Sequence, residues 1–168
     1  PQIRALAAER LPLTLAVSLH APNDVLRDSL VPLNKKYPIA QLIASCRDYA
    51  RETGRRVTFE YALIKGVNDR NEHALELGRL LSGMLAHLNL IPANPVTERG
   101  IAPPSRERVH DFKRLVEKHG VATTVRRELG AEIDAACGQL RRRIYSGTAA
   151  VAPGRSPVEP VEGFRRPK

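Results

Sequence analysis

Short apolar runs alternate with longer amphipathic stretches along most of this chain. Runs rich in apolar and β-branched residues predict strands over 13–20, 56–64, 87–91 and 121–128. Helical periodicity predicts helices over 39–53, 69–82 and 105–118, a short one over 24–30, one over 132–143, and the last turns of a helix over 2–10. Strands that alternate with helices predict βαβ units and a parallel sheet, so the fold class is α/β.

Residues that suit helix ends support these boundaries. Asn23 or Asp24 is placed to cap the short helix over 24–30, and Ser105 is placed to cap the helix over 105–118. Asp69, with Glu72 three residues on, predicts a capping box for the helix that ends near residue 82.

Polar and apolar side chains alternate within the first three predicted strands. One face carries Thr14, Ala16, Ser18, His20, Thr58, Glu60, His87 and Asn89, and the opposite face is apolar. We therefore expect the polar set to converge on one concave side, with Ser18, His20, Glu60 and Asn94 facing one cavity. Glu60 suits a buried ion pair and a polar contact to a ligand equally well.

Composition limits the classes of function. Lysine and arginine exceed aspartate and glutamate by 27 − 18 = +9, which favours a polyanionic partner. Two distant cysteines exclude a disulfide framework and predict a reducing cytoplasm. No apolar run approaches the ~18 residues of a membrane span. From Ser146 onward Pro, Gly, Ser and charge dominate, so we expect domain 1–145 followed by a disordered tail, 146–168.

Cys137 lies between two arginine clusters, residues 126–127 and 141–143. Positive charge nearby favours the thiolate, so Cys137 is a candidate nucleophile. The same arginines also suit contacts with a phosphate backbone. Cys46 instead lies on the apolar side of a predicted helix, and we expect it to be buried packing.

Several motifs in one order resemble a known family. They are SLHAPND (18–24), LVPLNKKYP (30–38), RRVTFEY (55–61), GVND (66–69), NLIPANP (89–95), TVRR (124–127) and DAACGQL (134–140). Together they resemble the RlmN family of radical S-adenosylmethionine (SAM) methyltransferases, which methylate C2 of adenine in 23S rRNA and tRNA. The resemblance implies the second half of a partial (β/α)6 radical-SAM barrel, a cytoplasmic monomer and an electron donor as a further partner.

The resemblance also implies roles for five residues. Ser18, Leu19 and His20 would contact SAM, as would Asn94. Cys137 would accept a methyl group from one SAM. A second SAM would be cleaved reductively at a [4Fe–4S] cluster, and the radical so formed would take hydrogen from the methylated cysteine.

The chain departs from the family pattern in its metal ligands. The family holds its cluster with three cysteines spaced C-x3-C-x2-C, and that motif is absent here. No metal ligand is therefore assigned in this chain. The glycine-rich SAM segment and the resolving cysteine are also missing, and the sequence begins at Pro1. We expect a piece truncated at its amino-terminal side, inactive alone, with the cluster ligands in the part before it.

Other functions stay open at this stage. A relative within the family methylates C8 of the same adenine. A non-catalytic, basic RNA-binding module would bind RNA without needing Cys137. An ordinary barrel aldolase or isomerase often needs a lysine or carboxylate at a strand end, where only Glu60 is available.

Overall fold

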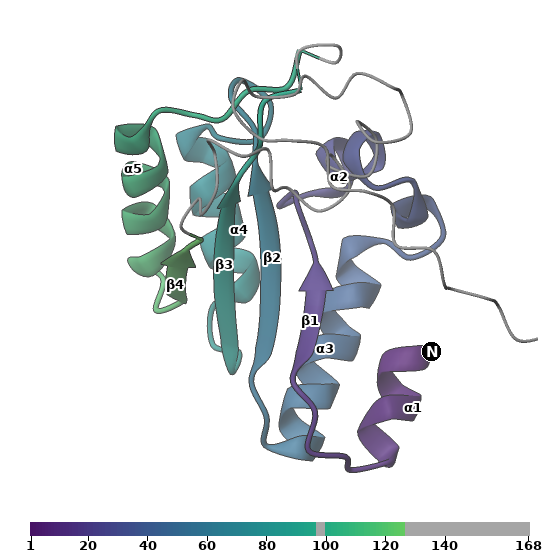
Figure 1. Ribbon diagram of the computed structural model, residues 1–168. Coiled ribbons are helices and arrows are strands. Elements are labelled where there is room, and N and C mark those ends of the chain that lie inside the picture. Colours follow the sequence, from purple (N-terminus) through teal and green to yellow (C-terminus); the bar gives the residue numbers. More distant parts are fainter. Residues whose placement is uncertain (97–99, 127–168) are drawn as a thin grey trace, which may run out of the picture. The chain divides into compact units, whose positions relative to one another are not determined.

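The computed structural model describes residues 1–96 and 100–126 (Figure 1). Its strands are β1 (Leu15–Ser18), β2 (Val57–Leu63), β3 (Ala86–Pro92) and β4 (Ala122–Val125). Its helices are α1 (Gln2–Ala8), α2 (Asp24–Leu30), the 3-10 turn η1 (Pro32–Lys35), α3 (Ile39–Thr53), α4 (Asn71–Leu81) and α5 (Arg106–Glu117). Cys137, the helix predicted over 132–143, the domain boundary at 145 and the tail 146–168 lie outside the described residues.

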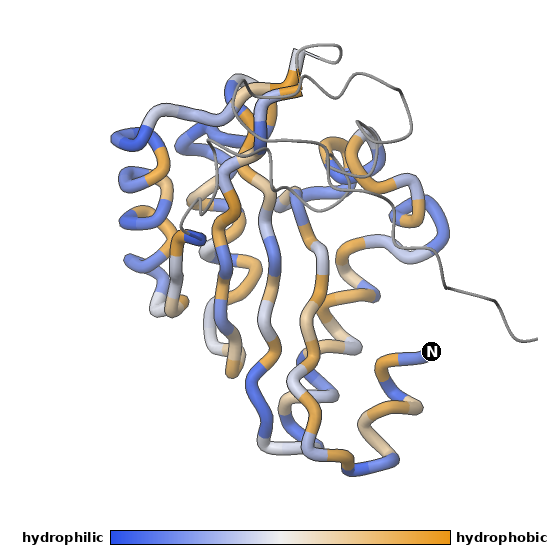
Figure 2. Tube along the Cα trace, viewed as in Figure 1, coloured by the Kyte–Doolittle hydropathy of each residue, from blue (hydrophilic) through white to orange (hydrophobic). Residues whose placement is uncertain are grey.

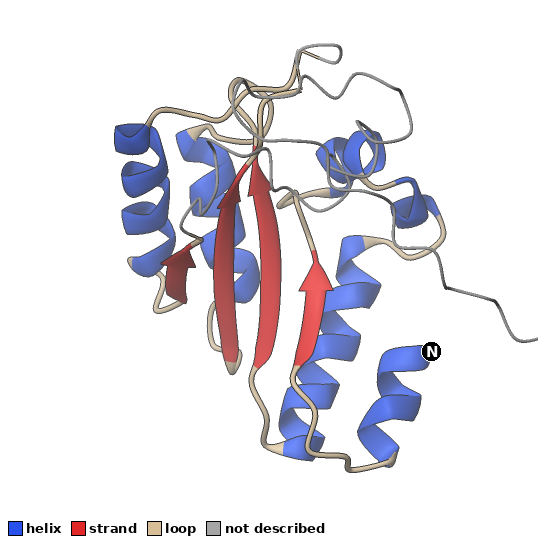
Figure 3. Cartoon of the chain, in the orientation of Figure 1, coloured by secondary structure: helices blue, strands red, loops and turns tan. Residues whose placement is uncertain are grey.

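The four strands form one parallel sheet in the order β1-β2-β3-β4. Neighbours in the sheet are therefore neighbours in sequence, and a helix lies in each connection between them. Figure 3 shows the strands side by side, with α3 and α4 behind them. The α/β class with parallel strands is thus confirmed.

One face of the sheet packs against the helices. Along β2 the burial alternates strictly, and Val57, Phe59, Tyr61 and Leu63 are completely buried. The ring of Tyr61 lies 5.4 Å from that of Phe112 on α5, so α5 shares this face. Figure 2 shows the alternation of hydrophobic and hydrophilic residues along the central strands. Burial of this apolar layer is the main force that holds the helices on the sheet.

Three helix ends are formed by residue types that are typical of such ends. The Asn23 side chain accepts from the N–H of Leu26 at 3.0 Å, and Ser105 Oγ accepts from the N–H of Arg108 at 3.2 Å. Gly54 ends α3 with a φ of 65°, in the left-handed region that glycine adopts without steric cost.

Two predicted boundaries are wrong. Asp69 does not cap α4, because its carboxylate accepts from the N–H of Gly66 at 2.9 Å, and the helix begins only at Asn71. The first strand is four residues long rather than eight, and Leu13 is 44% exposed instead of packed on the helices. Among the described residues, no helix combines the length and apolar character needed to cross a lipid bilayer.

Candidate functional site

The second face of the sheet carries small and polar side chains in two rows. In-register partners in adjacent parallel strands project to the same side. The row nearer the carboxyl ends of the strands, here called the polar row, comprises Ser18, Glu60, Asn89 and Thr124. The row behind it comprises Ala16, Thr58, His87 and Ala122. All eight side chains are exposed or half-buried. The predicted polar face is thus confirmed for its six members within β1–β3, whereas Thr14 precedes β1 and His20 follows it.

Hydrogen bonds connect the β3 and β4 members of the two rows. Thr124 Oγ1 donates to Asn89 Oδ1 at 3.4 Å and lies 2.9 Å from His87 Nε2. The remaining nitrogen, Nδ1, is buried without a hydrogen-bond partner among the described residues. Burial, followed by the charge of Arg56, lowers the pKa of His87.

The segment from Ser18 to His20 leaves the sheet at the end of β1. The N–H of Leu19 donates to the main-chain oxygen of Glu60 at 2.9 Å, which extends the pairing with β2. His20 then takes a φ of 60°, a left-handed conformation that is uncommon for a residue other than glycine. Its ring Nδ1 accepts from the N–H of Ala62 at 3.0 Å.

The hydrogen bond from Ala62 fixes the tautomer of His20. Since Nδ1 accepts a hydrogen bond, the proton of the neutral ring is on Nε2. Burial lowers the pKa of His20; the carboxylate of Glu60 raises it and the charge of Arg27 lowers it further. The ring is therefore neutral at pH 7, and Nε2–H is a donor with no partner among the described residues.

The candidate residues have different access to a ligand. Ser18 is exposed, and His20 is half-buried. The Leu19 side chain is completely buried in the core. A ligand at this edge would thus meet the side chains of Ser18 and His20, with Leu19 as the buried anchor between them.

Asn94 follows β3 at the same carboxyl edge of the sheet. The N–H of Ala93 donates to the main-chain oxygen of Leu63 at 2.9 Å, which ties the start of this segment to the end of β2. Val96 then pairs with Ile101 in an antiparallel bridge. Asn94 itself is exposed. That Ser18, His20, Glu60 and Asn94 share one cavity stays a prediction.

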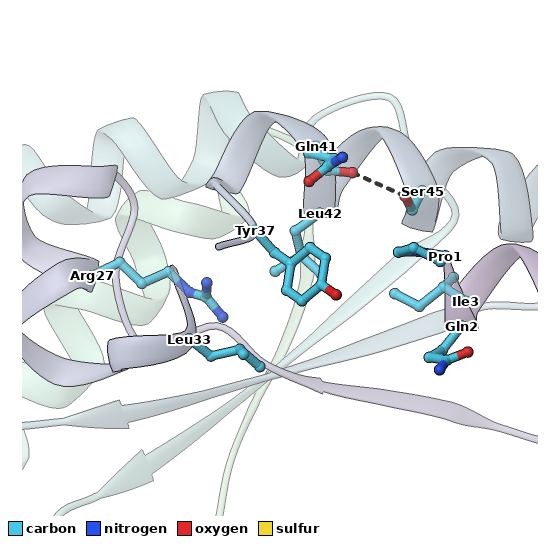
Figure 4. A pocket seen from close by; sticks show the side chains of 9 residues that line it. All are labelled: Pro1, Gln2, Ile3, Arg27, Leu33, Tyr37, Gln41, Leu42 and Ser45. Carbon is cyan, nitrogen blue, oxygen red and sulfur yellow. Dashed lines mark hydrogen bonds between the residues drawn. The ribbon is translucent and has the colours of Figure 1, made fainter. Parts of the chain in front are cut away.

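A cavity of about 230 Å³ lies elsewhere, between α1, η1 and α3. Figure 4 shows the nine residues that line it, and the side chains of the polar row are not among them. The lining is Pro1, Gln2, Ile3, Arg27, Leu33, Tyr37, Gln41, Leu42 and Ser45.

Cys46 is fully buried on α3, as predicted, and burial raises the pKa of its thiol to about 12. Such a thiol stays protonated and is a poor metal ligand or nucleophile. No group of three or more His, Cys, Asp or Glu suited to a metal ion occurs within residues 1–96 and 100–126.

Sequence comparisons give close relatives over part of their length. No family model matches the chain. A probable dual-specificity RNA methyltransferase RlmN from Pelotomaculum thermopropionicum is 71% identical over 145 residues, 86% of this chain and 39% of that protein. The protein of the same name from Desulforudis audaxviator is 64% identical over 143 residues, 85% of this chain and 45% of that protein. The chain thus spans less than half the length of these relatives.

Solved structures agree with the sequence relatives. The crystal structure of a radical SAM methyltransferase from Sphaerobacter thermophilus matches with a TM-score of 0.78 and 57% identity, over 83% of this chain and 41% of that one. A domain of pyruvate-formate lyase-activating enzyme from Bacteroides vulgatus matches with a TM-score of 0.53 at 15% identity, which is evidence for the fold alone.

Proposed function

We propose that the chain belongs to the RlmN family, whose curated relatives it matches over about 40% of their length, and that it forms part of a radical SAM RNA methyltransferase. In this proposal residues 1–145 are the second half of a partial (β/α)6 barrel, and 146–168 are a tail outside it. The remaining strands of the barrel are proposed to lie in the part of the relatives' length that this chain does not cover. The substrate is adenine C2 in 23S rRNA and tRNA, and the protein works in the cytoplasm.

The polar row and the segment after β1 suit SAM as a ligand. SAM offers a carboxylate, an ammonium, a sulfonium and ribose hydroxyls, which together need donors, acceptors and a negative charge. The Ser18 hydroxyl, the Nε2–H of His20 and the amide of Asn94 supply donors at the carboxyl edge of the sheet, where parallel α/β folds bind ligands. SAM, when bound, supplies the methyl group and the radical that the reaction needs.

Glu60 is the carboxylate of the polar row, in register between Ser18 and Asn89. The negative charge of Glu60 raises the pKa of His20, so it acts electrostatically on the segment 18–20 that would bind SAM. A negative charge there complements the ammonium or the sulfonium of SAM. We assign Glu60 to the electrostatics of the ligand site rather than to catalysis.

The iron–sulfur cluster of the family does not fit the residues described here. Cluster ligands are cysteine thiolates, whereas Cys46 is a buried, protonated thiol. The ligands, and the contact with an electron donor, are therefore proposed to lie in the part of the relatives' length that this chain does not cover.

Cys137 is proposed as the carrier of the transferred carbon. A thiolate is the strongest side-chain nucleophile for a methyl group. Its sulfur would attack the methyl carbon of SAM, forming a sulfur–carbon bond while the bond to the sulfonium breaks and S-adenosylhomocysteine leaves. Arginines at 126–127 and 141–143 would favour the thiolate and contact RNA phosphates. Methylation at C8 of the adenine remains the second candidate reaction.

The family match carries this proposal, and two measurements on the protein at the full length of its relatives test it. Ser18→Ala and Asn94→Ala should each weaken SAM binding in equilibrium dialysis. Ser29→Ala is the matched control, because Ser29 is also exposed but its hydroxyl donates only to the Leu26 carbonyl at 2.7 Å. Equal affinity in all the variants would reject the site.

Mass spectrometry tests the carrier. After incubation with SAM, the peptide containing residues 134–141 should gain one methyl mass on Cys137. Cys137→Ala should abolish RNA methylation while SAM binding persists. Full RNA methylation by Cys137→Ala would show that the carbon does not pass through this residue.

A further inference from the structure

Three successive main-chain carbonyls at the end of β1 are all held by buried side chains. Arg27 Nη2 donates to the oxygen of Ser18 at 3.0 Å, and Arg27 Nε donates to the oxygen of Leu19 at 2.9 Å. Asn68 Nδ2 donates to the oxygen of His20 at 2.9 Å. The carbonyls of Ser18, Leu19 and His20 are thus fixed by one residue of α2 and one residue of the loop between β2 and α4.

Arg27 is buried to an unusual degree for an arginine, with 5% of it exposed. Its third donor, Nη1, binds Asn34 Oδ1 at 2.8 Å. Asn34 in turn donates from Nδ2 to Asp24 at 2.9 Å and to Asp28 at 2.7 Å. The guanidinium is therefore paired at each nitrogen and held beside two carboxylates, so it has one orientation.

Asn68 is completely buried and connects the same segment to β2. Its Nδ2 donates to the oxygen of Ala62 at 2.7 Å as well as to His20, and its Oδ1 accepts from the N–H of Ile64 at 2.7 Å. The hydroxyl of Tyr61 donates to the Asn68 carbonyl at 2.9 Å. Asn68 thereby fixes the distance between His20 and the end of β2.

These contacts hold a backbone conformation that the chain would not adopt alone. His20 has a φ of 60°, and such left-handed conformations in residues other than glycine persist only where surrounding contacts determine them. Once the conformation is fixed, the His20 ring reaches the N–H of Ala62 and the Ser18 side chain stays on the side of the polar row.

We propose that Arg27 and Asn68 are positioning residues, which act through the main chain of residues 18–20 to aim the Ser18 hydroxyl and the His20 Nε2–H at the bound ligand. This inference rests on the proposed function, in which those two side chains bind SAM. Neither Arg27 nor Asn68 touches the ligand in this proposal. A shift of about 1 Å in a binding group is enough to lower affinity or rate by a large factor.

Two conservative variants of the full-length protein test the proposal. Asn68→Asp keeps the size and the acceptor for Ile64 but loses the donor to His20 and Ala62. Arg27→Lys keeps the charge but cannot donate to two successive carbonyls and Asn34 together. Arg47→Lys is the matched control, since Arg47 Nη2 also donates to two main-chain oxygens, of Leu80 at 3.0 Å and Ser82 at 3.2 Å, at the end of α4.

The readouts are the dissociation constant for SAM, the melting temperature and the ring ¹⁵N shifts of His20. We expect Asn68→Asp and Arg27→Lys to weaken SAM binding by about tenfold or more at temperatures where both remain folded. Their His20 ring signals should show a mixture of tautomers in place of the Nε2–H form. Arg47→Lys should stay within about twofold of the unsubstituted protein in affinity.

The outcomes separate this inference from the proposed function. If the unsubstituted protein does not bind SAM, the proposed function fails. If it binds SAM and Ser18→Ala weakens binding, but Asn68→Asp and Arg27→Lys bind normally, the positioning role is wrong and the SAM site stands. Equal losses in Arg47→Lys would also overturn the positioning role. Hydrogen exchange of the Ala62 amide needs no variant: exchange at the rate of an unfolded chain would overturn the proposal.

Discussion

The main-chain N–H of Ala62 donates to Nδ1 of His20 at 3.0 Å, across 42 residues of sequence. This single bond places a neutral imidazole at the end of β1 and leaves its proton on Nε2. A protonated ring has no acceptor on Nδ1, so protonation would break the bond. The charge state of His20 and the conformation of residues 18–20 are therefore linked.

The first prediction concerns the pH dependence of stability. The pKa values of His20 and His87 are lowered from 6.5 in the folded protein, mainly by burial. At pH values between the folded and the unfolded pKa of each histidine, the unfolded chain binds more protons than the folded protein. The free energy of unfolding therefore falls as the pH drops below about 6.5. Urea unfolding at pH 7.5 and 5.5 measures this change.

His20→Asn is the variant that assigns the effect. Asparagine tolerates a positive φ, and its Oδ1 can accept from the Ala62 N–H without titrating. We expect a smaller difference between the two pH values for this variant. An unchanged difference would mean that His20 does not contribute to the pH dependence.

A second prediction concerns the packing of α4 against His119, in the turn that follows α5. A Cβ atom at Gly78 would lie 2.6 Å from His119 Nδ1 and 3.1 Å from its Cβ. Although alanine stabilises helices by about 1 kcal/mol over glycine, we expect Gly78→Ala to lower the free energy of unfolding by roughly 1–3 kcal/mol. Chemical denaturation measures this.

His119→Ala is the control for the steric argument. In that background much of the clash is removed, so Gly78→Ala should cost less than it does in the unsubstituted protein. Equal costs in the two backgrounds would show that His119 is not the obstacle.

Much of the fold is predictable because it depends on local pattern. The period-two alternation around Thr58 and Glu60 gave the correct polar face of β2, since one face of a strand in this sheet must meet the helices. The caps at Asn23 and Ser105 follow from local hydrogen bonding that any helix start requires.

The features missed in the sequence depend on contacts distant along the chain. Arg27 looks like a solvated residue on a short helix, and only the approach of the β1 carbonyls makes it a buried donor. Asp69 has the spacing of a helix cap, but its carboxylate instead accepts a hydrogen bond from the N–H of Gly66 in the preceding turn. The sequence also gives no signal that Asn68 is buried, because its partners are the main-chain oxygens of His20, after β1, and of Ala62 in β2.

A third prediction concerns RNA. With a net charge of +9, the chain should bind single-stranded RNA, and the log–log salt slope should be about −0.7 for each phosphate neutralised. If RNA approaches the carboxyl edge of the sheet, Lys65→Gln should reduce affinity and slope. Arg55→Gln changes a residue that is also exposed, just before β2, and should leave both unchanged. Affinity that does not depend on salt would reject electrostatic RNA binding.

A fourth prediction concerns iron. The chain has two cysteines in unrelated segments, and Cys46 is fully buried. Anaerobic reconstitution of this chain should therefore give no stoichiometric [4Fe–4S] cluster, as measured by iron and sulfide content and the absorbance spectrum. A stoichiometric cluster that survives Cys137→Ala would contradict the proposal that the cluster ligands lie outside this chain.

The sequential order of the strands has a consequence for how the chain folds. Each strand pairs with the next one along the sequence, so no pairing within the described residues has to wait for a distant segment. The entropy of loop closure is then divided into three moderate steps, one for each βαβ unit. The sheet should therefore fold faster than a parallel sheet of the same size whose strand order is not sequential. We expect β2 and β3, the two longest strands, to gain protection first in pulse-labelled hydrogen exchange, with β1 and β4 joining on either side.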